Sequence, residues 1–255
     1  MPSGHIFSGA TTMRGFFALF GLVGCVWAYV ATPVFWSSIL ARSLTSRIQA
    51  DERLSPGSLR SALERIERHT PTFMVQPETV KGRALVQLRI AKEDLLKQGS
   101  QDLDERVGAA IESLNEALSL LPADSFLWLM LYSERVSQRG IDAVSLKYLE
   151  RSYSLGPLEG WISLRRNRLS LAAFPFLSQP MRDNAVSEFS TIVDGGLIED
   201  AADILASTGW SYRHFLLPGL QRVDPDRRKA LSKRLWANGI KVEVPGVDDN
   251  DRPWH

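Results

Sequence analysis

Six arginines near the middle of the chain could recognise an anionic ligand. They are Arg135, Arg139, Arg151, Arg165, Arg166 and Arg168. A guanidinium group presents a planar fork of N–H donors that matches a carboxylate or a phosphate bidentately. The set is therefore a candidate binding site for a partner such as an anionic polysaccharide or a lipid headgroup. A solvated helix face whose aliphatic stems cover apolar surface is the more common meaning of such a charge run.

Aromatic side chains are concentrated further along, at Trp210, Tyr212, His214 and Phe215. We expect them to pack the last helices together, because aromatic rings dominate core burial. Stacking on sugar rings is the alternative.

Glu199 and Asp203 are the carboxyl pair of a rival hypothesis, in which a glycan-acting enzyme uses them as acid and base. Their position early in a short helix also suits the helix dipole.

Sequence motifs for other chemistry are absent. The chain has no GxSxG, GxxxxGK[ST] or HExxH motif and no GxGxxG after a strand. Its four histidines are isolated from one another, and Cys25 is its single cysteine, which excludes an intramolecular disulfide and a zinc site of paired cysteines. We therefore predict that the protein is not an enzyme, and that it has no catalytic residues, no cofactor and no metal.

The charge balance excludes one class of partner. Thirty basic residues against 29 acidic ones give a net charge of +1. Binding to nucleic acid needs a clear basic excess or stripe. We therefore expect no nucleic-acid partner.

An N-terminal segment, 15–41, contains no charged residue between Arg14 and Arg42. About 20 apolar residues suffice to cross a bilayer, so this segment predicts a single transmembrane helix. Trp27, Tyr29 and Trp36 are candidate interfacial aromatics, and Pro33 is expected to end or kink the helix. Residues 1–14 then form an N-terminal tail, and 42–54 form a linker.

Two alternatives to the membrane helix involve processing of this segment. A cleaved signal peptide would need a small-x-small site, and bulky Tyr29 stands two residues before Ala31. A lipoprotein signal is suggested by the sequence LVGC ending at Cys25, although the residues that follow stay apolar through Leu40. A periplasmic lipoprotein processed at Cys25 therefore remains an alternative to the anchor. Counting positive charges alone would place the large domain inside the cell.

The sequence pattern in the rest of the chain predicts helices. Ser55-Pro56 and Pro77 mark helix starts, and Asp224-Pro225 caps the last helix. Between Pro77 and Gly99 the apolar positions 80, 84, 88, 91 and 95 form one stripe at helical spacing. We predict an all-α protein, in which a helical-repeat domain over 55–240 is followed by a loose tail over 241–255.

Two proline-ended phrases indicate the repeat. ALSLLP ends at Pro122 and SYSLGP ends at Pro157, 35 residues apart, close to the 34-residue tetratricopeptide period. The region between them resembles the tetratricopeptide family, with five repeat-defining residues: Ala117, Pro122, Trp128, Gly140 and Pro157. The resemblance implies a degenerate antiparallel helical array that holds partner segments on its concave face. Tyr132 and Arg135 depart from the family pattern, so the ligand groove of the family is not carried over.

Residues 149–189 contain the phrase Gly156-Pro157-Leu158-Glu159, followed by Arg165 and Arg182. In these features the segment resembles a group of membrane-anchored accessory proteins of bacterial exopolysaccharide synthesis and export. The resemblance implies a single-pass inner-membrane scaffold with a periplasmic domain, which binds other envelope or polysaccharide-assembly proteins and could also meet an anionic glycan. A glycan-acting or glycan-binding envelope protein is the alternative function.

Overall fold

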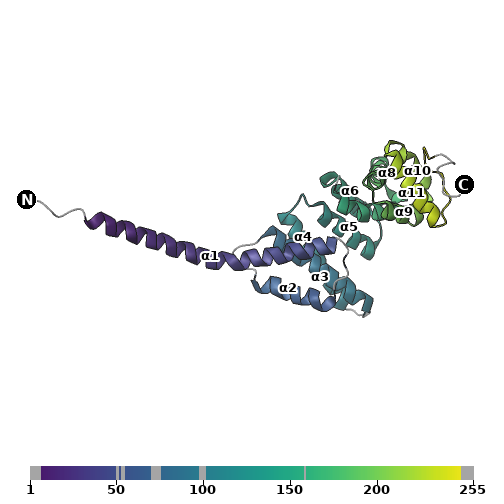
Figure 1. The fold of residues 1–255 in the computed structure, drawn as a ribbon. Helices are drawn as coiled ribbons and strands as arrows, with labels where there is room; N and C mark the ends of the chain where they lie inside the picture. The colour runs from purple at the N-terminus through teal and green to yellow at the C-terminus, as the bar shows by residue number, and fades with distance from the viewer. Residues whose placement is uncertain are drawn as a thin grey trace, which may run out of the picture. The chain divides into compact units, whose positions relative to one another are not determined.

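The computed structural model describes residues 7–49, 52, 55–69, 76–97, 102–157 and 159–247; within these ranges the side chains of 7–12, 30–31, 33–38, 49, 56, 69, 95–97 and 102–104 are not described. Every regular element in these ranges is a helix, which confirms the all-α prediction (Figure 1). The chain divides into two compact units, 1–120 and 121–255. The boundary cuts the predicted repeat domain (55–240) between Ala117 and Pro122.

The first unit contains four helices within its described residues. They are α1 (Phe7–Gln49), α2 (Pro56–His69), α3 (Pro77–Lys97) and α4 (Asp102–Leu120). The predicted apolar stripe of α3 is buried at all four positions whose side chains are described: Val80, Ala84, Leu88 and Ala91. From α4, Leu114 and Ala117 are completely buried. Helices α3 and α4 pack along each other, as their short connection favours.

Helix α1 is longer than the predicted membrane helix at both ends. It begins at Phe7, inside the predicted N-terminal tail (1–14), and continues past Pro33 to Gln49. The predicted linker over 42–54 is therefore wrong for 42–49. Ala41, Leu44 and Ile48 are buried at a spacing of three and four residues, so they form a helical stripe that packs on α3 and α2.

The approach of α1 to α3 depends on Gly82. A Cβ atom at Gly82 would lie 2.7 Å from the Cβ of Ala41 and 3.0 Å from its Cα. Two helix backbones can come this close only where one of them lacks a side chain. The pair Ala41 and Gly82 therefore fixes where the last turns of α1 lie on α3.

The preceding part of α1 is apolar and exposed. Its described large apolar side chains between Met13 and Tyr29 are 57% to 84% exposed, and this part extends beyond α2, α3 and α4 (Figure 1). Among the described residues, no helix combines the length and the apolar character that a membrane crossing needs. The predicted transmembrane segment, 15–41, includes 30–31 and 33–38, whose side chains lie outside the described ones, and it stays a prediction.

A buried carboxylate connects three helices of the first unit. Asp94 of α3 accepts a hydrogen bond from Arg60 of α2 at 2.6 Å and another from Arg106 of α4 at 2.8 Å. The Asp94 side chain is only 11% exposed, whereas both arginines are more than half exposed. Two cations thus share one anion where α2, α3 and α4 meet.

The second unit contains seven α-helices and three short 3-10 helices within its described residues. Its elements are α5 (Ser125–Arg139), α6 (Ala143–Leu155), α7 (Gly160–Ala172), η1 (Phe174–Phe176), α8 (Gln179–Asp194), α9 (Ile198–Ala206), η2 (Trp210–Tyr212), α10 (Arg213–Gly219), η3 (Leu220–Arg222) and α11 (Pro225–Ala237). Phe189 of α8 and Ile204 of α9 lie at the centre of its core, completely buried. Leu231 of α11 closes the core from the C-terminal side.

Helices α5 and α6 form the predicted hairpin. Asp124 caps α5 by accepting hydrogen bonds from the backbone N–H groups of Phe126 and Leu127. Gly140 ends α5 with φ at 76°, a conformation that glycine adopts without steric cost. The indole N–H of Trp128 donates to the carbonyl of Pro122 at 2.9 Å, so two of the repeat-defining residues contact each other.

The segment after α11 packs on the unit instead of hanging free. Val244 and Val247 are buried, and a guanidinium N–H of Arg228 donates to the carbonyl of Pro245 at 2.6 Å. The predicted loose tail is therefore wrong for 241–247, while 248–255 lie outside the described residues. The alternation of apolar and polar residues in KVEVPGV was too short a signal to predict this packing.

Candidate functional site

The structure separates the six predicted partner-binding arginines into different environments. Arg139 and Arg151 are exposed on α5 and α6, and Arg165 is half-buried on α7. Arg168 pairs with Asp200 at 3.2 Å. Arg166 is completely buried, so for this residue the prediction of a partner-binding surface is wrong.

Arg135 is committed to the α5–α6 hairpin. Its guanidinium binds both carboxylate oxygens of Asp142, at 2.6 to 3.0 Å. Asp142 is also the N-cap of α6, where it accepts a hydrogen bond from the backbone N–H of Ser145. The bond from Arg135 and the bond from Ser145 both lower the pKa of Asp142 well below its ordinary value. Arg135 thus stabilises a helix cap.

A buried polar cluster surrounds Arg166. Its Nε and Nη2 donate to one carboxylate oxygen of Glu188 on α8, at 2.8 and 2.6 Å. The guanidinium also donates to the carbonyls of Ser152 and Gly156 at the end of α6, and it lies 4.3 Å from the centre of the Tyr153 ring. The cluster therefore joins α6, α7 and α8.

Further hydrogen bonds join the other polar groups of this cluster to one another. The hydroxyl of Tyr153 donates to Glu188 at 2.8 Å and lies 2.9 Å from the hydroxyl of Ser170. Burial raises the pKa of the Glu188 carboxyl, against the opposing effect of Arg166, and raises the pKa of Tyr153 well above its ordinary value. Because these side chains are sealed from solvent and bonded to one another, the cluster acts as a structural junction.

The aromatic segment mainly packs, as expected. Tyr212 and Phe215 lie 4.5 Å and 5.4 Å from the buried ring of Phe174, measured between ring centres. Arg213 stacks over Trp210 at 4.5 Å. Phe215 nevertheless remains 46% exposed, so part of its ring is available to a ligand.

The carboxyl pair of the enzyme hypothesis lies on an open face of α9. Glu199 and Asp203 are both exposed, and Glu199 forms an ion pair with Arg234 of α11. A pair of this kind lacks the enclosed setting in which an acid and a base would flank a glycosidic bond. In the described part of the chain, no group of three or more His, Cys, Asp or Glu side chains could hold a metal ion.

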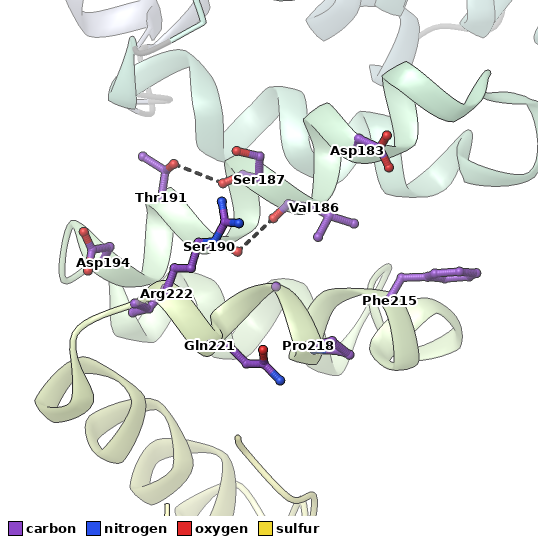
Figure 2. A pocket seen from close by; sticks show the side chains of 12 residues that line it. Asp183, Val186, Ser187, Ser190, Thr191, Asp194, Phe215, Pro218, Gln221 and Arg222 are labelled. Atoms are coloured by element: carbon purple, nitrogen blue, oxygen red, sulfur yellow. Dashed lines mark hydrogen bonds between the residues drawn. The ribbon is translucent and has the colours of Figure 1, made fainter. Parts of the chain in front are cut away.

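A groove between α8 and the α10–η3 segment is the candidate site (Figure 2). Its volume is about 620 Å³, within the roughly 300–1,000 Å³ typical of small-molecule sites. Its lining comprises Asp183, Val186, Ser187, Ser190, Thr191 and Asp194 from α8, and Phe215, Pro218, Gly219, Gln221, Arg222 and Val223 from the opposite side. The two helical segments come close where Gly219 faces Val186, because a Cβ at Gly219 would lie 2.8 Å from a Val186 methyl group.

Polar groups line the groove along its length. Asp194 lies at one end, Phe215 and Asp183 lie at the other, and the side chain of Arg222 extends towards α8 between them (Figure 2). The hydroxyls of Ser190 and Thr191 donate to backbone carbonyls one turn earlier in α8, at 3.1 and 3.0 Å. Each hydroxyl proton is therefore already used, and each hydroxyl oxygen can only accept a further hydrogen bond.

Sequence reasoning missed this groove. Asp183, Ser187, Ser190 and Asp194 follow one another at spacings of four, three and four residues, which places them on one face of a helix. The same pattern marks any solvated helix face, so the pattern alone did not single them out. The opposite wall comes from the irregular α10–η3 segment, whose path has no periodic signal.

Comparison of the chain with protein-family models, with curated proteins and with solved structures returns no match.

Proposed function

We propose that this protein is a single-pass inner-membrane scaffold. Helix α1 anchors it in the bilayer, and its helical units bind protein partners in the production or export of a cell-surface polysaccharide. The exposed apolar surface of α1 carries the proposal. The link to polysaccharide comes from the resemblance of residues 149–189 to accessory proteins of that process, and it also favours a periplasmic position for the units.

The exposed side chains of α1 support the anchor. Phe16, Phe20 and Trp27 are each more than 60% exposed, and large contiguous apolar surfaces on soluble monomers are rare. The charge-free segment 15–41 would be about 40 Å long at 1.5 Å per residue, which exceeds a hydrocarbon core of about 30 Å. A lipid environment would accommodate this surface without any further protein.

The continuity of α1 supports a rigid connection between the anchor and the first unit. The same helix that carries the apolar surface continues to Gln49 and packs on α3 through Ala41, Leu44 and Ile48. A membrane helix that continues directly into a folded unit would hold that unit close to the bilayer. This arrangement suits a protein that gathers partners at a membrane surface.

Membrane fractionation of the full chain tests the anchor. We expect the protein to stay in the membrane pellet after washing with carbonate and to be released only by detergent. Replacing Phe20 and Val23 with arginine should release it, since each arginine near the bilayer centre opposes insertion by about 2.5–3.5 kcal/mol. Recovery of the unaltered chain in the carbonate wash would contradict the proposal.

Two further measurements test the remaining parts of the proposal. Cross-linking followed by detergent pull-down should recover polysaccharide-assembly or other envelope proteins, and recovery of none would remove the scaffold role. A phosphatase fused after His255 should be active if the C-terminus lies in the periplasm. Cys25→Ala should leave attachment and electrophoretic mobility unchanged, whereas a change in either would favour the lipoprotein alternative.

A further inference from the structure

We propose that the groove between α8 and α10–η3 binds an uncharged glycan segment. The inference deepens the proposed role in polysaccharide production and relies on that role only for the biological source of the glycan. The groove itself carries the argument through its hydrogen-bonding groups, its charge and its exposed aromatic ring. Each of these features points to a ligand rich in hydroxyl groups.

The hydrogen-bonding groups on α8 mainly accept. Ser190 and Thr191 have already committed their protons to backbone carbonyls. One carboxylate oxygen of Asp183 accepts a hydrogen bond from the side-chain amide of Gln179, and one of Asp194 accepts from the backbone N–H of Asp224. The other oxygen of each carboxylate remains to accept from a ligand. An occupant must therefore donate several hydrogen bonds, as the hydroxyls of a sugar do.

The opposite wall supplies the complementary donors. The side chains of Gln221 and Arg222 have no hydrogen-bond or ion-pair partner among the described residues. Amide and guanidinium groups donate to hydroxyl oxygens, and their planar geometry suits neighbouring hydroxyls on one sugar ring. A ligand whose groups both donate and accept would therefore satisfy both walls, whereas a purely cationic or purely anionic group would satisfy one.

The charge of the lining disfavours an anionic ligand. Two carboxylates, Asp183 and Asp194, oppose the single guanidinium of Arg222. An acidic sugar would bind Arg222 but would meet a net negative surface elsewhere in the groove. We therefore infer an uncharged sugar, in contrast to the anionic glycan considered as a partner of the six arginines.

Phe215 provides an apolar face at one end of the groove. Its ring is 46% exposed, and packing against Phe174 and His214 holds it in place. A fixed, partly exposed ring stacks on the apolar C–H face of a sugar without losing much side-chain freedom on binding. Phe215 therefore sets the end of the groove at which a sugar ring would stack.

A binding assay with defined trisaccharides tests this proposal on the full chain in a detergent without sugar headgroups. The probes are cellotriose, mannotriose and N,N′,N″-triacetylchitotriose as uncharged ligands, trigalacturonic acid as the anionic ligand and trilysine as the cationic peptide. We expect saturable binding of at least one uncharged trisaccharide by calorimetry. No binding of any uncharged probe, or tighter binding of trigalacturonic acid or trilysine, would overturn the proposal.

Two matched pairs of variants locate the site. Phe215→Ala should weaken binding roughly threefold to tenfold, as expected for loss of one stacking contact, while Phe176→Ala should not, because Phe176 is 60% exposed but does not line the groove. Ser187→Trp should block the groove, while Ser154→Trp, at an exposed position of α6 that does not line the groove, should not. Equal losses within either pair would overturn the assignment.

The same variants separate this proposal from the proposed scaffold role. All four should fractionate with membranes and retain their protein partners. Lost glycan binding with normal membrane attachment would confirm the groove independently of the anchor. Release of the unaltered chain from membranes would contradict the anchor and leave the binding result intact.

Discussion

Arg166 and Glu188 form an ion pair in the interior of the second unit, with 2.6 Å between Nη2 and Oε1. The side chain of Arg166 is 0% exposed and that of Glu188 is 3% exposed. A charge buried this deeply is stable only while its partner remains. Glu188 therefore compensates the charge that α7 inserts between α6 and α8.

Removing either partner of this pair should destabilise the second unit strongly. We expect Arg166→Met or Glu188→Leu to lower the free energy of unfolding by about 3–5 kcal/mol, because each leaves an uncompensated buried charge. The double variant should recover part of that loss. Chemical denaturation measures all three, with Arg168→Met as a control that changes stability by about 1 kcal/mol or less, since its pair with Asp200 is exposed. Additive single losses would show that the two charges do not compensate each other.

Arg135 should control the titration of Asp142. In the unfolded chain the pKa of Asp142 takes its ordinary value near 3.8, and in the fold it lies well below that. As the pH falls towards and below about 3.8, the unfolded chain takes up a proton at Asp142 before the folded chain does. The ionised cap therefore stabilises the fold fully above that pH, and this stabilisation is lost as the pH falls through the pKa of Asp142 in the folded state. Arg135→Gln should raise the pKa of Asp142, as measured by carboxyl NMR titration. An unchanged pKa would contradict the role assigned to Arg135.

Gly82 and Gly108 should respond oppositely to alanine. In an ordinary helix, glycine to alanine stabilises by up to about 1 kcal/mol. A methyl group at Gly108 would have no neighbouring atom within 4 Å, so Gly108→Ala should show that gain. Gly82→Ala should instead cost about 1–3 kcal/mol, because the new methyl group meets the backbone of Ala41. Thermal denaturation measures the change in stability of both variants. A gain in stability for Gly82→Ala would exclude the close approach of α1 to α3.

Asp94→Ala should loosen the first unit. It leaves Arg60 and Arg106 near each other without the carboxylate that they share, at a cost of about 1–3 kcal/mol. Hydrogen exchange should then increase in α2, the shortest helix of the four. Glu64→Ala is the matched control, because the contact between Glu64 and Arg68 is 4.0 Å long and exposed. Equal exchange in the two variants would argue against a structural role for Asp94.

The helices were largely predictable from local signals. Ser55, Pro77 and the Asp224-Pro225 pair mark the starts of α2, α3 and α11 correctly, because caps and proline act within one turn. The α5–α6 turn at Gly140 follows from the same local physics. These signals mark where a helix begins and ends, because helix ends are determined by residues that are close together in the sequence.

The candidate site was less predictable because its walls meet only in three dimensions. Ser187 and Arg222 are far apart in the sequence, and neither shows a pattern that differs from a solvated surface. The prediction for Arg166 was wrong for a related reason. Arg166 is buried while its neighbours Arg165 and Arg168 are half-buried and exposed, and nothing in the sequence distinguishes the three. A sequence shows that a guanidinium is present but does not show that a carboxylate from another helix, Glu188, meets it in the interior.

The packing of Val244 and Val247 determines where the chain can be cut. A truncation after Ile240, which the sequence would suggest, removes both buried valines and the carbonyl that Arg228 binds. The apolar surface left behind on the unit would be exposed to water and prone to self-association. Expression and fusion designs should therefore keep the chain intact at least through Val247 and place any tag or reporter beyond it.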